Sequence, residues 1–172
     1  MAMATPRVFG KPSSPKQVAP GETYLKTLHV VNNGRYRLLK HAFPIGDIID
    51  ETTCCIGEHV PVKDVKHLFD ADNTLAGIVV VEDGKPCGLV MRQHLDRYLG
   101  RKYGVPLYYE KPITRIMDKL PLIVDHGTPV ELVSQAAMSR DKIKLYDNIL
   151  VTRNGMLLGT VSVQTLLDTM TR

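Results

Sequence analysis

The sequence contains no tryptophan, three cysteines and few aromatic residues, which make up 6% of its 172 residues. Two of the cysteines, Cys54 and Cys55, are adjacent, so they do not form the spaced framework of a disulfide-rich secreted domain. No Cys-x-x-Cys pair and no histidine cluster has the spacing of a zinc site. No apolar run approaches the roughly 20 residues that a membrane span needs. These absences predict a cytoplasmic protein with no metal and no membrane span.

Basic charge is concentrated at the N-terminal end. Up to Phe43 there are seven Lys or Arg residues against one Asp or Glu, whereas from Pro44 onward there are 15 against 17. A nucleic-acid surface needs a basic stripe with stacking aromatic residues on the folded part of the chain, so nucleic acid is not expected as a partner. Residues 1–43 also contain four prolines between positions 6 and 20. They are predicted to be a basic, proline-rich arm or linker, or the end of a preceding domain.

An internal repeat is the strongest pattern in the chain. With an offset of 68 residues, "PIGDIIDETTCCIGEHVPVKDV" aligns with "PITRIMDKLPLIVDHGTPVELV", and this pairs Asp50 with Asp118. Further along the offset becomes 71, and "GLVMRQH" aligns with "GTVSVQT". A self-similar period of this length indicates a duplicated structural unit. The repeat predicts two domains, at 44–103 and 104–172.

Each copy is predicted to form a strand, a helix, two strands and a final helix. The apolar runs "CCI" and "LIV" are typical of short buried strands. Asp83-Gly84 and Asn154-Gly155 predict tight hairpin turns, because glycine accepts the positive φ that such turns require. The predicted fold class is α+β, with two β-α-β-β-α repeats packed sheet to sheet as one pseudo-twofold module.

Local signals also predict where two helices begin and end. Thr128 and Glu131 have the spacing of a capping box, in which each side chain bonds to the other residue's backbone N–H. Gly100 follows an apolar helical pattern and is predicted to end that helix as a C-terminal glycine.

A tandem β-α-β-β-α pair with Gly-apolar-apolar-Thr/Ser-x-x-Asp/Asn after the hairpin resembles a pair of cystathionine-β-synthase (CBS) domains, also called a Bateman module. The resemblance covers Pro44 to Arg172, and the second copy is the stronger match. It implies a regulatory module, without catalytic activity of its own, that binds adenine nucleotides between the copies and forms a homodimer.

A finer resemblance concerns the attached domains. The segments "YDNILVTRNGMLLGTVSVQTLL" and "VFGKPSSP" are similar to parts of bacterial proteins in which CBS pairs accompany EAL and GGDEF domains. Those domains make and break cyclic di-GMP. The resemblance implies EAL- and GGDEF-type domains as flanking partners, in a full-length diguanylate cyclase or phosphodiesterase.

The resemblance also implies a set of ligand-binding residues. In the family, the motif's hydroxyl meets phosphate and its carboxylate binds the ribose. Ser162 matches the hydroxyl position, and Thr165 stands where the family has the carboxylate. In the first copy, Met91 and His94 replace both residues. The other expected contacts lie in the second copy. Leu122 and Ile123 belong to its first expected strand, and Tyr146, Asp147 and Asn148 precede its middle strand.

Simpler interpretations exist for these residues. Ser162 and Thr165 could cap their own helix, residues 146–148 could form a turn, and His94 could be an ordinary helix-surface residue. The basic residues of the second copy could face phosphate or lie in a solvated loop: Arg140, Lys142, Lys144 and Arg153.

Two functions therefore remain open. The first is a regulatory module that senses an AMP- or ATP-like nucleotide and controls attached signalling domains. The second is a degenerate pair that binds no small ligand and acts as a dimerisation spacer, which the missing carboxylate favours. An enzyme is disfavoured, because no nucleophile–base pair, phosphate loop or metal-ligand spacing is present.

Overall fold

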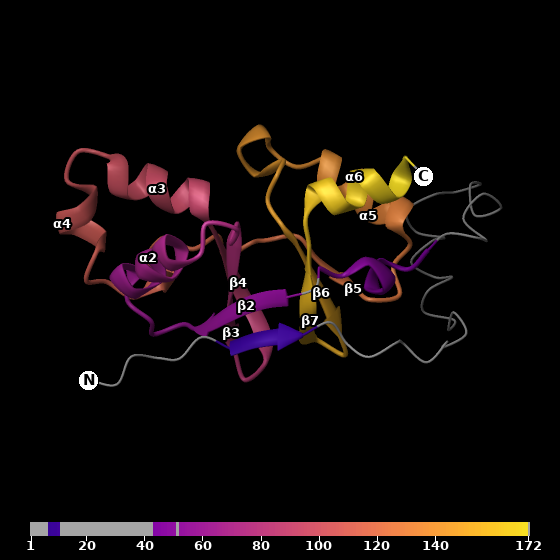
Figure 1. The fold of residues 1–172 in the computed structure, drawn as a ribbon, viewed down its shortest axis with the longest axis horizontal. Helices are drawn as coiled ribbons and strands as arrows, with labels where there is room; N and C mark the ends of the chain where they lie inside the picture. The colour runs from indigo at the N-terminus through magenta and orange to yellow at the C-terminus, as the bar shows by residue number, and fades with distance from the viewer. Residues whose placement is uncertain (1–6, 11–42, 51, 172) are drawn as a thin grey trace. The chain divides into compact units, whose positions relative to one another are not determined.

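The computed structural model describes residues 7–10, 43–50 and 52–171. The chain divides into two compact units, each with one β-sheet (Figure 1). Of the described residues, unit 1 contains 7–9 and 52–121, and unit 2 contains 10, 43–50 and 122–171.

The sheet of unit 1 has the order β1-β2-β3-β4. Strand β2 runs parallel to β3, and β3 is antiparallel to β4. In chain order, the elements are β1 (Arg7–Gly10), β2 (Thr52–Gly57), α2 (Val62–Ala71), β3 (Gly77–Glu82), β4 (Lys85–Met91), α3 (Arg92–Gly100), α4 (Gly104–Tyr108) and the 3-10 turn η2 (Ile113–Arg115).

The sheet of unit 2 has the order β5-β6-β7, again with a parallel pair followed by an antiparallel hairpin. Both units therefore contain the predicted β-α-β-β-α sequence, and the α+β fold class is confirmed. The elements are η1 (Ile45–Ile48), β5 (Ile123–Asp125), α5 (Val130–Met138), η3 (Lys142–Lys144), β6 (Ile149–Arg153), β7 (Met156–Val161) and α6 (Val163–Met170).

The two hairpins have the predicted turn conformation. Gly84 has a φ of 79° and Gly155 a φ of 78°, and each follows an Asp or Asn residue that also has positive φ. Both hairpins contain a register shift at the equivalent place, after Val80 in β3 and after Val151 in β6. The duplication therefore extends from the sequence to irregularities of the backbone.

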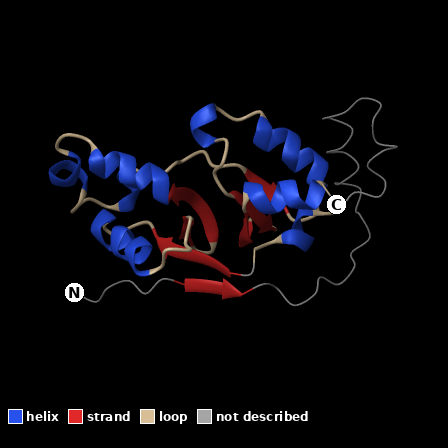
Figure 2. Cartoon of the chain, turned by 45° about the horizontal axis from the view of Figure 1, so that its top comes forward, coloured by secondary structure: helices blue, strands red, loops and turns tan. Residues whose placement is uncertain are grey.

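In each unit, the helices cover one face of the sheet (Figure 2). In unit 1, Phe69 of α2 and Leu95 of α3 form one buried cluster with Ile78 and Val80. Ile78 and Val80 are two positions apart, so they point to the same face of β3. Unit 2 has an equivalent cluster, which includes Val133, Ile149, Val151 and Leu166.

The segments that lead into the two repeats are exchanged between the units. Ile45 and Ile49, from the start of the first repeat, belong to the buried cluster of unit 2. Ile113 and Ile116, from the start of the second repeat, belong to the buried cluster of unit 1. The compact units thus divide the chain at different places from the sequence repeat, whose domain limits at 44–103 and 104–172 stay a prediction.

The exchanged segments also supply hydrogen-bond acceptors at two helix starts. The N–H of Val62, the first residue of α2, donates to the carbonyl of Lys111 at 2.9 Å. The N–H of Val130, the first residue of α5, donates to the carbonyl of Phe43 at 2.9 Å. Because the first N–H groups of a helix have no partner within it, these backbone contacts replace side-chain caps.

The capping box predicted at Thr128 and Glu131 is therefore wrong. Helix α5 starts after Pro129, and no side chain bonds to its N-terminus. One carboxylate oxygen of Glu131 is instead buried without a hydrogen-bond partner. The prediction considered only partners that are near in sequence. The N–H of Val130 instead donates to the backbone carbonyl of Phe43, just before the first repeat.

The end of α3 at Gly100 is confirmed, but Gly100 does not have the left-handed backbone of a C-terminal glycine stop. Helix α3 includes Gly100, and its C-cap is Arg101 in an extended conformation. The residue with left-handed backbone here is Tyr103, with a φ of 67°. Tyr103 is the N-cap of α4, so the left-handed residue belongs to the start of the next helix and not to the end of α3.

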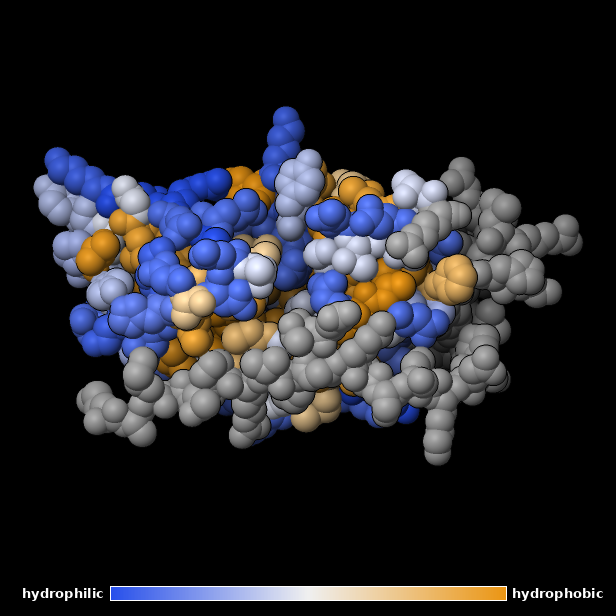
Figure 3. Space-filling model, in the orientation of Figure 1, coloured by the Kyte–Doolittle hydropathy of each residue, from blue (hydrophilic) through white to orange (hydrophobic). Residues whose placement is uncertain are grey.

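Apolar side chains are exposed at several places. The examples include Tyr103 and Leu107 near α4, and Ile143 and Tyr146 near η3. On the face drawn in Figure 3, apolar residues form small groups separated by hydrophilic ones. Within the described part of the chain, no helix has the length and apolar character to cross a membrane.

Candidate functional site

Ser162 lies at the junction between β7 and α6, where it forms the N-cap of the helix. Its Oγ accepts a hydrogen bond from the N–H of Thr165 at 3.1 Å. A serine is favourable here because its oxygen satisfies one of the free N–H groups at the helix start. Ser162 thus caps its own helix, as the simpler interpretation of this residue predicted.

Thr165 occupies the position where the family motif has a carboxylate. Its hydroxyl lies 2.9 Å from Ser162 Oγ and donates to Asp50 Oδ1 at 3.1 Å. The two hydroxyls therefore lie side by side at the start of α6, and a carboxylate from a distant part of the sequence contacts one of them.

Asp50 completes this group, and the sequence-based site did not include it. Its Oδ2 accepts a hydrogen bond from the N–H of Ser162 at 3.0 Å. Its own N–H donates to the carbonyl of Thr160 at 2.9 Å, which fixes the end of η1 against β7. Both carboxylate oxygens thus face the N-terminus of α6, where the helix dipole favours negative charge.

Two opposing effects act on the pKa of Asp50. Partial burial raises the pKa above its usual value, because desolvation disfavours the charged form. The hydrogen bonds from Thr165 and Ser162 act in the opposite direction, and burial is the larger effect. Asp50 is therefore a carboxylate that is well hydrogen-bonded but incompletely hydrated.

Strand pairing brings further predicted residues to the same end of the sheet. Ile149 at the start of β6 pairs with Val161 at the end of β7. The residues next to this pair are Asn148 and Ser162, so they lie at one edge of the sheet. The edge contains the hydroxyl pair and the turn before β6.

Leu122 and Ile123 lie next along this edge. Strand β5 is parallel to β6, with Ile123 opposite Leu150, and the carbonyl of Leu122 accepts the N–H of Leu150 at 2.9 Å. Leu122 packs partly against the core of unit 2, whereas Ile123 is exposed. All the candidate residues from the second copy therefore belong to unit 2.

The turn before β6 has one exposed and two buried side chains. Tyr146 is 66% exposed, whereas Asp147 and Asn148 are 2% and 9% exposed. Tyr146 is thus the member of the predicted set that is most accessible to a ligand. The burial of the other two is consistent with the simpler interpretation, in which they shape the turn.

Arg140 holds this turn in place. Its Nη2 donates to the carbonyls of Leu145 and Asp147 at 3.1 and 3.0 Å, and its Nε donates to the carbonyl of Ala137 at 3.1 Å. These contacts give Arg140 a structural role at the end of α5. Lys142 and Arg153, by contrast, are exposed.

The equivalent corner of unit 1 has a different character. Met91 is the N-cap of α3, is 5% exposed and makes no side-chain cap, while His94 is half-buried. At Gly88, a Cβ atom would lie 2.4 Å from Sδ of Met117, so this methionine packs directly on the glycine backbone. This corner therefore has a buried methionine in place of the capping serine and lacks the hydroxyl pair.

The carboxylates of the two repeats also differ. Asp118, which aligns with Asp50, makes an equivalent backbone contact, because its N–H donates to the carbonyl of Leu89 at 2.9 Å. Its Oδ1, however, accepts the N–H of Leu120 in its own loop at 3.0 Å. The pairing of Asp50 with Asp118 in the repeat was the sequence signal that could have drawn attention to Asp50.

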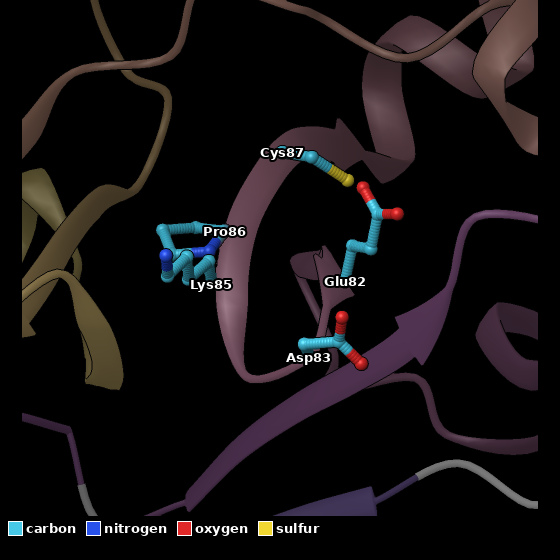
Figure 4. A pocket seen from close by; sticks show the side chains of 5 residues that line it. All are labelled: Glu82, Asp83, Lys85, Pro86 and Cys87. Carbon is cyan, nitrogen blue, oxygen red and sulfur yellow. The ribbon is translucent and has the colours of Figure 1, made fainter.

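A shallow hollow lies elsewhere, at the β3–β4 hairpin (Figure 4). Burial raises the pKa of the Cys87 thiol, and the nearby carboxylates of Glu58 and Glu82 raise it further. The thiol is therefore not an activated nucleophile. The residues that line the hollow are Glu82, Asp83, Lys85, Pro86 and Cys87.

The adjacent cysteines are similarly unreactive. Burial raises the pKa of Cys54 to about 11, and the Cys55 side chain is fully buried. Thiols in such positions behave as small apolar groups. Over the described residues, no group of three or more His, Cys, Asp or Glu side chains is arranged to hold a metal ion.

Comparisons with known proteins agree with this architecture. Residues 45–101 match the family model of the CBS domain. A CBS-domain protein from Agrobacterium tumefaciens is 16% identical with a TM-score of 0.59, and the match covers 74% of this chain and 98% of that one. The CBS-pair protein CBSX2 from Arabidopsis thaliana is 19% identical with a TM-score of 0.60, over 76% and 95% of the two chains.

The chain has the fold of a CBS domain pair. The family model matches the first repeat, although the motif after the hairpin had predicted the second as the stronger match. The matched range begins at η1 and ends just after α3, so it includes a segment that packs in unit 2.

Two solved CBS pairs contain bound ligands. CBSX2 in complex with AMP is 18% identical with a TM-score of 0.59, over 75% of this chain and 96% of that one. A CBS pair in complex with 5′-methylthioadenosine and S-adenosyl-L-methionine is 15% identical with a TM-score of 0.58, over 74% and 98%. A search of the curated proteins with the sequence found no match.

Proposed function

We propose that this CBS pair is a regulatory module that binds an adenine-type nucleotide or nucleoside and controls attached signalling domains. The proposed site is the edge of unit 2 at the start of α6. The proposal rests mainly on one observation: Ser162, Thr165 and Asp50 place two hydroxyls and a carboxylate together at this edge. Hydroxyls and a carboxylate are groups that can bind the polar part of a nucleoside.

The rest of the edge can supply an apolar contact for a base. Ile123 and Tyr146 are both exposed side chains of unit 2. Ligand sites commonly combine such apolar contacts with a few fixed polar groups. The ligands named for the two solved CBS pairs are AMP, 5′-methylthioadenosine and S-adenosyl-L-methionine, and they guide the choice of test compounds.

Thermal melts test the proposal directly. AMP, ATP, S-adenosylmethionine and cyclic di-GMP are added separately at millimolar concentration. A ligand that binds the native state raises the melting temperature by mass action, and at 100 times its Kd the stabilisation is about 2.7 kcal/mol. A flat response to every compound would contradict the proposal.

Variants can then locate the site. Ser162→Ala removes the hydroxyl and should reduce the ligand-induced shift, because a neutral hydrogen bond contributes about 1 kcal/mol. The readout is the shift relative to each variant's own melting temperature, since the lost cap also lowers stability. Met91→Leu is the matched control at the equivalent corner of unit 1. An equal loss of response in both variants would place the site elsewhere.

The spacer function remains the alternative, and one contact favours it. Asp50 already accepts the hydroxyl of Thr165 and the N–H of Ser162, so the group is hydrogen-bonded without a ligand. If the module is a ligand-free spacer, no nucleotide should raise its melting temperature, and the protein should form a stable homodimer. Light scattering over a range of concentrations measures the second property.

The attached domains are a further part of the proposal. EAL- and GGDEF-type neighbours, and therefore control of cyclic di-GMP turnover, are suggested by the two short segments similar to such proteins. The test is the cyclase or phosphodiesterase activity of the full-length protein with and without the ligand found by thermal melts. An unchanged activity would contradict this part alone.

A further inference from the structure

Helix α4 of unit 1 presents a group of exposed apolar side chains (Figure 1). Tyr103 is 63% exposed, Val105 47% and Leu107 57%. These three residues, together with the two basic residues before them, are called the α4 tip (residues 101–107). Single apolar residues scattered over a surface need no explanation, whereas a contiguous group indicates an interaction site.

The α4 tip and its neighbouring residues are also basic. The only carboxylate in the sequence range 97–111 is Glu110, and it already pairs with Lys63 at 2.7 Å. Among the described residues, no carboxylate pairs with any of the basic side chains of this range, which are all exposed. They are Arg97, Arg101, Lys102 and Lys111. The exposed apolar group therefore lies beside unpaired positive charge.

The α4 tip is held in place by close packing against α3. Gly104 is buried, and a Cβ atom there would overlap the carbonyl oxygen of Tyr98, so the two backbones meet directly. The rings of Tyr98 and Tyr108 also pack edge to face, with their centroids 5.6 Å apart. A surface that is already fixed loses less conformational entropy when it binds a partner.

Tyr103 occupies a backbone position that does not favour a bulky side chain. Its φ is 67°, in the left-handed region that glycine and asparagine adopt more easily. The ring does not repay this cost by filling the core, because it is exposed. Nζ of Lys102 lies 5.2 Å from the ring centroid, so a positive charge accompanies the ring. Strain at an exposed aromatic residue is typical of a functional position.

The combination of groups selects the kind of partner. The unpaired cations need anionic groups, and Val105 and Leu107 need hydrocarbon. A nucleic acid supplies phosphates and stacking bases, but it has no apolar layer for aliphatic side chains. An anionic bilayer supplies both, because charged headgroups cover an acyl layer. Tyrosine is favourable at the boundary between them, and four of the chain's seven tyrosines lie between positions 98 and 109.

We infer that the α4 tip docks unit 1 on the surface of anionic lipid membranes. Tyr103, Val105 and Leu107 enter the boundary between headgroups and acyl chains. Arg101 and Lys102 contact the lipid phosphates. The inference goes beyond the proposed function and does not depend on ligand binding by unit 2.

Leu107→Trp provides a direct test, because the chain contains no other tryptophan. The whole chain is mixed with vesicles of phosphatidylcholine alone, or of phosphatidylglycerol and phosphatidylcholine in equal amounts. Only the anionic vesicles should shift the emission to shorter wavelength, and brominated acyl chains should quench it. Ile143→Trp, at an exposed position in unit 2, is the matched control and should show neither effect. No shift for Leu107→Trp, or equal shifts for both variants, would overturn the inference.

The basic N-terminal arm can itself attract anionic vesicles, so the variants that test binding leave it intact. Val105→Ser combined with Leu107→Ser should weaken co-sedimentation with anionic vesicles at least about 10-fold, because two apolar side chains no longer insert. Leu120→Ser combined with Ile143→Ser removes two exposed aliphatic side chains elsewhere and should leave binding unchanged. Equal binding by the two double variants would contradict docking through the α4 tip.

The basic residues of the tip are tested in the same assay. Arg101→Gln combined with Lys102→Gln should weaken binding about 25-fold at low salt, because each basic residue near an anionic surface contributes about fivefold. The loss should become smaller as salt is added, since salt screens exposed charges. Unchanged binding at low salt would count against lipid phosphates as the partner of these residues.

Tyr103→Asn separates docking from folding. Asparagine adopts the left-handed backbone more easily, so the melting temperature should stay the same or rise. Vesicle binding should nevertheless decrease, because the ring is lost from the boundary. Unchanged vesicle binding would overturn the role assigned to Tyr103.

The Leu107→Trp emission also distinguishes other partners. A shift with a single-stranded oligonucleotide but not with vesicles would make nucleic acid the partner. A shift that appears when the protein concentration alone is raised would mean that a second copy of the chain covers the tip. Either result would overturn the inference.

Discussion

At the residue scale, Asp50 is the member of the site that the sequence-based prediction missed, although the repeat alignment pairs it with Asp118. It contacts Ser162 and Thr165, which are 112 and 115 positions further along the chain. A contact over this distance depends on the whole fold of unit 2. The position of the hydroxyl pair, by contrast, could be predicted because it follows a hairpin with a local signature.

Asp50 should make a measurable contribution to the pH dependence of stability. Burial raises its pKa in the folded protein above the usual 3.8, so the folded state binds the proton more tightly than the unfolded state does. Stability due to this group is therefore greatest below the unfolded pKa and falls as pH rises through the folded pKa. The Asp50→Asn side chain cannot ionise, so the stability of this variant does not fall with pH through this group.

Thermal melts between about pH 3.5 and pH 7 measure this contribution, a range that begins just below the reference pKa of Asp. The difference in melting temperature, Asp50→Asn minus wild type, should increase as the pH rises from about 4. Ser162→Ala is the control, because it retains the Asp50 carboxylate and should differ from wild type by a nearly constant amount. A constant difference for Asp50→Asn as well would show that burial does not perturb Asp50.

At the element scale, predictions succeeded where the signal was local. Both hairpins have the conformation that Asp-Gly and Asn-Gly indicate, because positive φ is a property of the turn residues themselves. The capping box failed because the first N–H of α5 finds its acceptor at Phe43. The first N–H groups of α2 and α5 find their acceptors far away in the sequence, at Lys111 and Phe43, which a local pattern cannot include.

The strand β4 provides an element-scale test of close packing. Gly88→Ala would place a Cβ atom 2.4 Å from Sδ of Met117 and 3.1 Å from the carbonyl oxygen of Asp118. The methionine can shift, but the backbone carbonyl limits the space. We expect a loss of about 1–3 kcal/mol in the free energy of unfolding, measured by urea denaturation.

Gly57→Ala, in β2, is the matched control for this substitution. Nothing lies within 4 Å of a Cβ at Gly57, which is exposed, so its effect should stay within about 0.5 kcal/mol. Equal effects at the two glycines would mean that the Met117 side chain and the Asp118 carbonyl move away from position 88 at no cost in stability.

At the scale of the whole molecule, the repeat predicts the fold better than it predicts the packing units. Each repeat has its β-α-β-β-α order from its own sequence, but its leading segment packs in the other unit. Nothing in the alignment distinguishes a segment that packs locally from one that packs across, because both copies have apolar residues at equivalent places. Ile45 and Ile113 align with each other and are both fully buried.

Two fragments of the chain test this division. Residues 44–103 follow the sequence repeat, whereas residues 52–121 follow unit 1 and retain Ile113 and Ile116. Truncating one buried isoleucine typically costs about 2–5 kcal/mol, so the fragment that lacks both should be far less stable. Circular dichroism melts should show a cooperative transition for 52–121 and a weaker one, or none, for 44–103. The reverse order would contradict the assignment of the leading segments.

The exchange of leading segments also affects how the chain can fold during synthesis. A ribosome completes residues 52–121 before the rest of the second repeat, so these residues of unit 1 can assemble while translation continues. Ile45 and Ile49 emerge earlier, yet the cluster that buries them includes Leu166 near the C-terminus. The nascent chain must therefore carry Ile45 and Ile49 without the cluster that buries them until the elements from β5 to α6 have been synthesised. That interval is when a chaperone has the greatest opportunity to bind them.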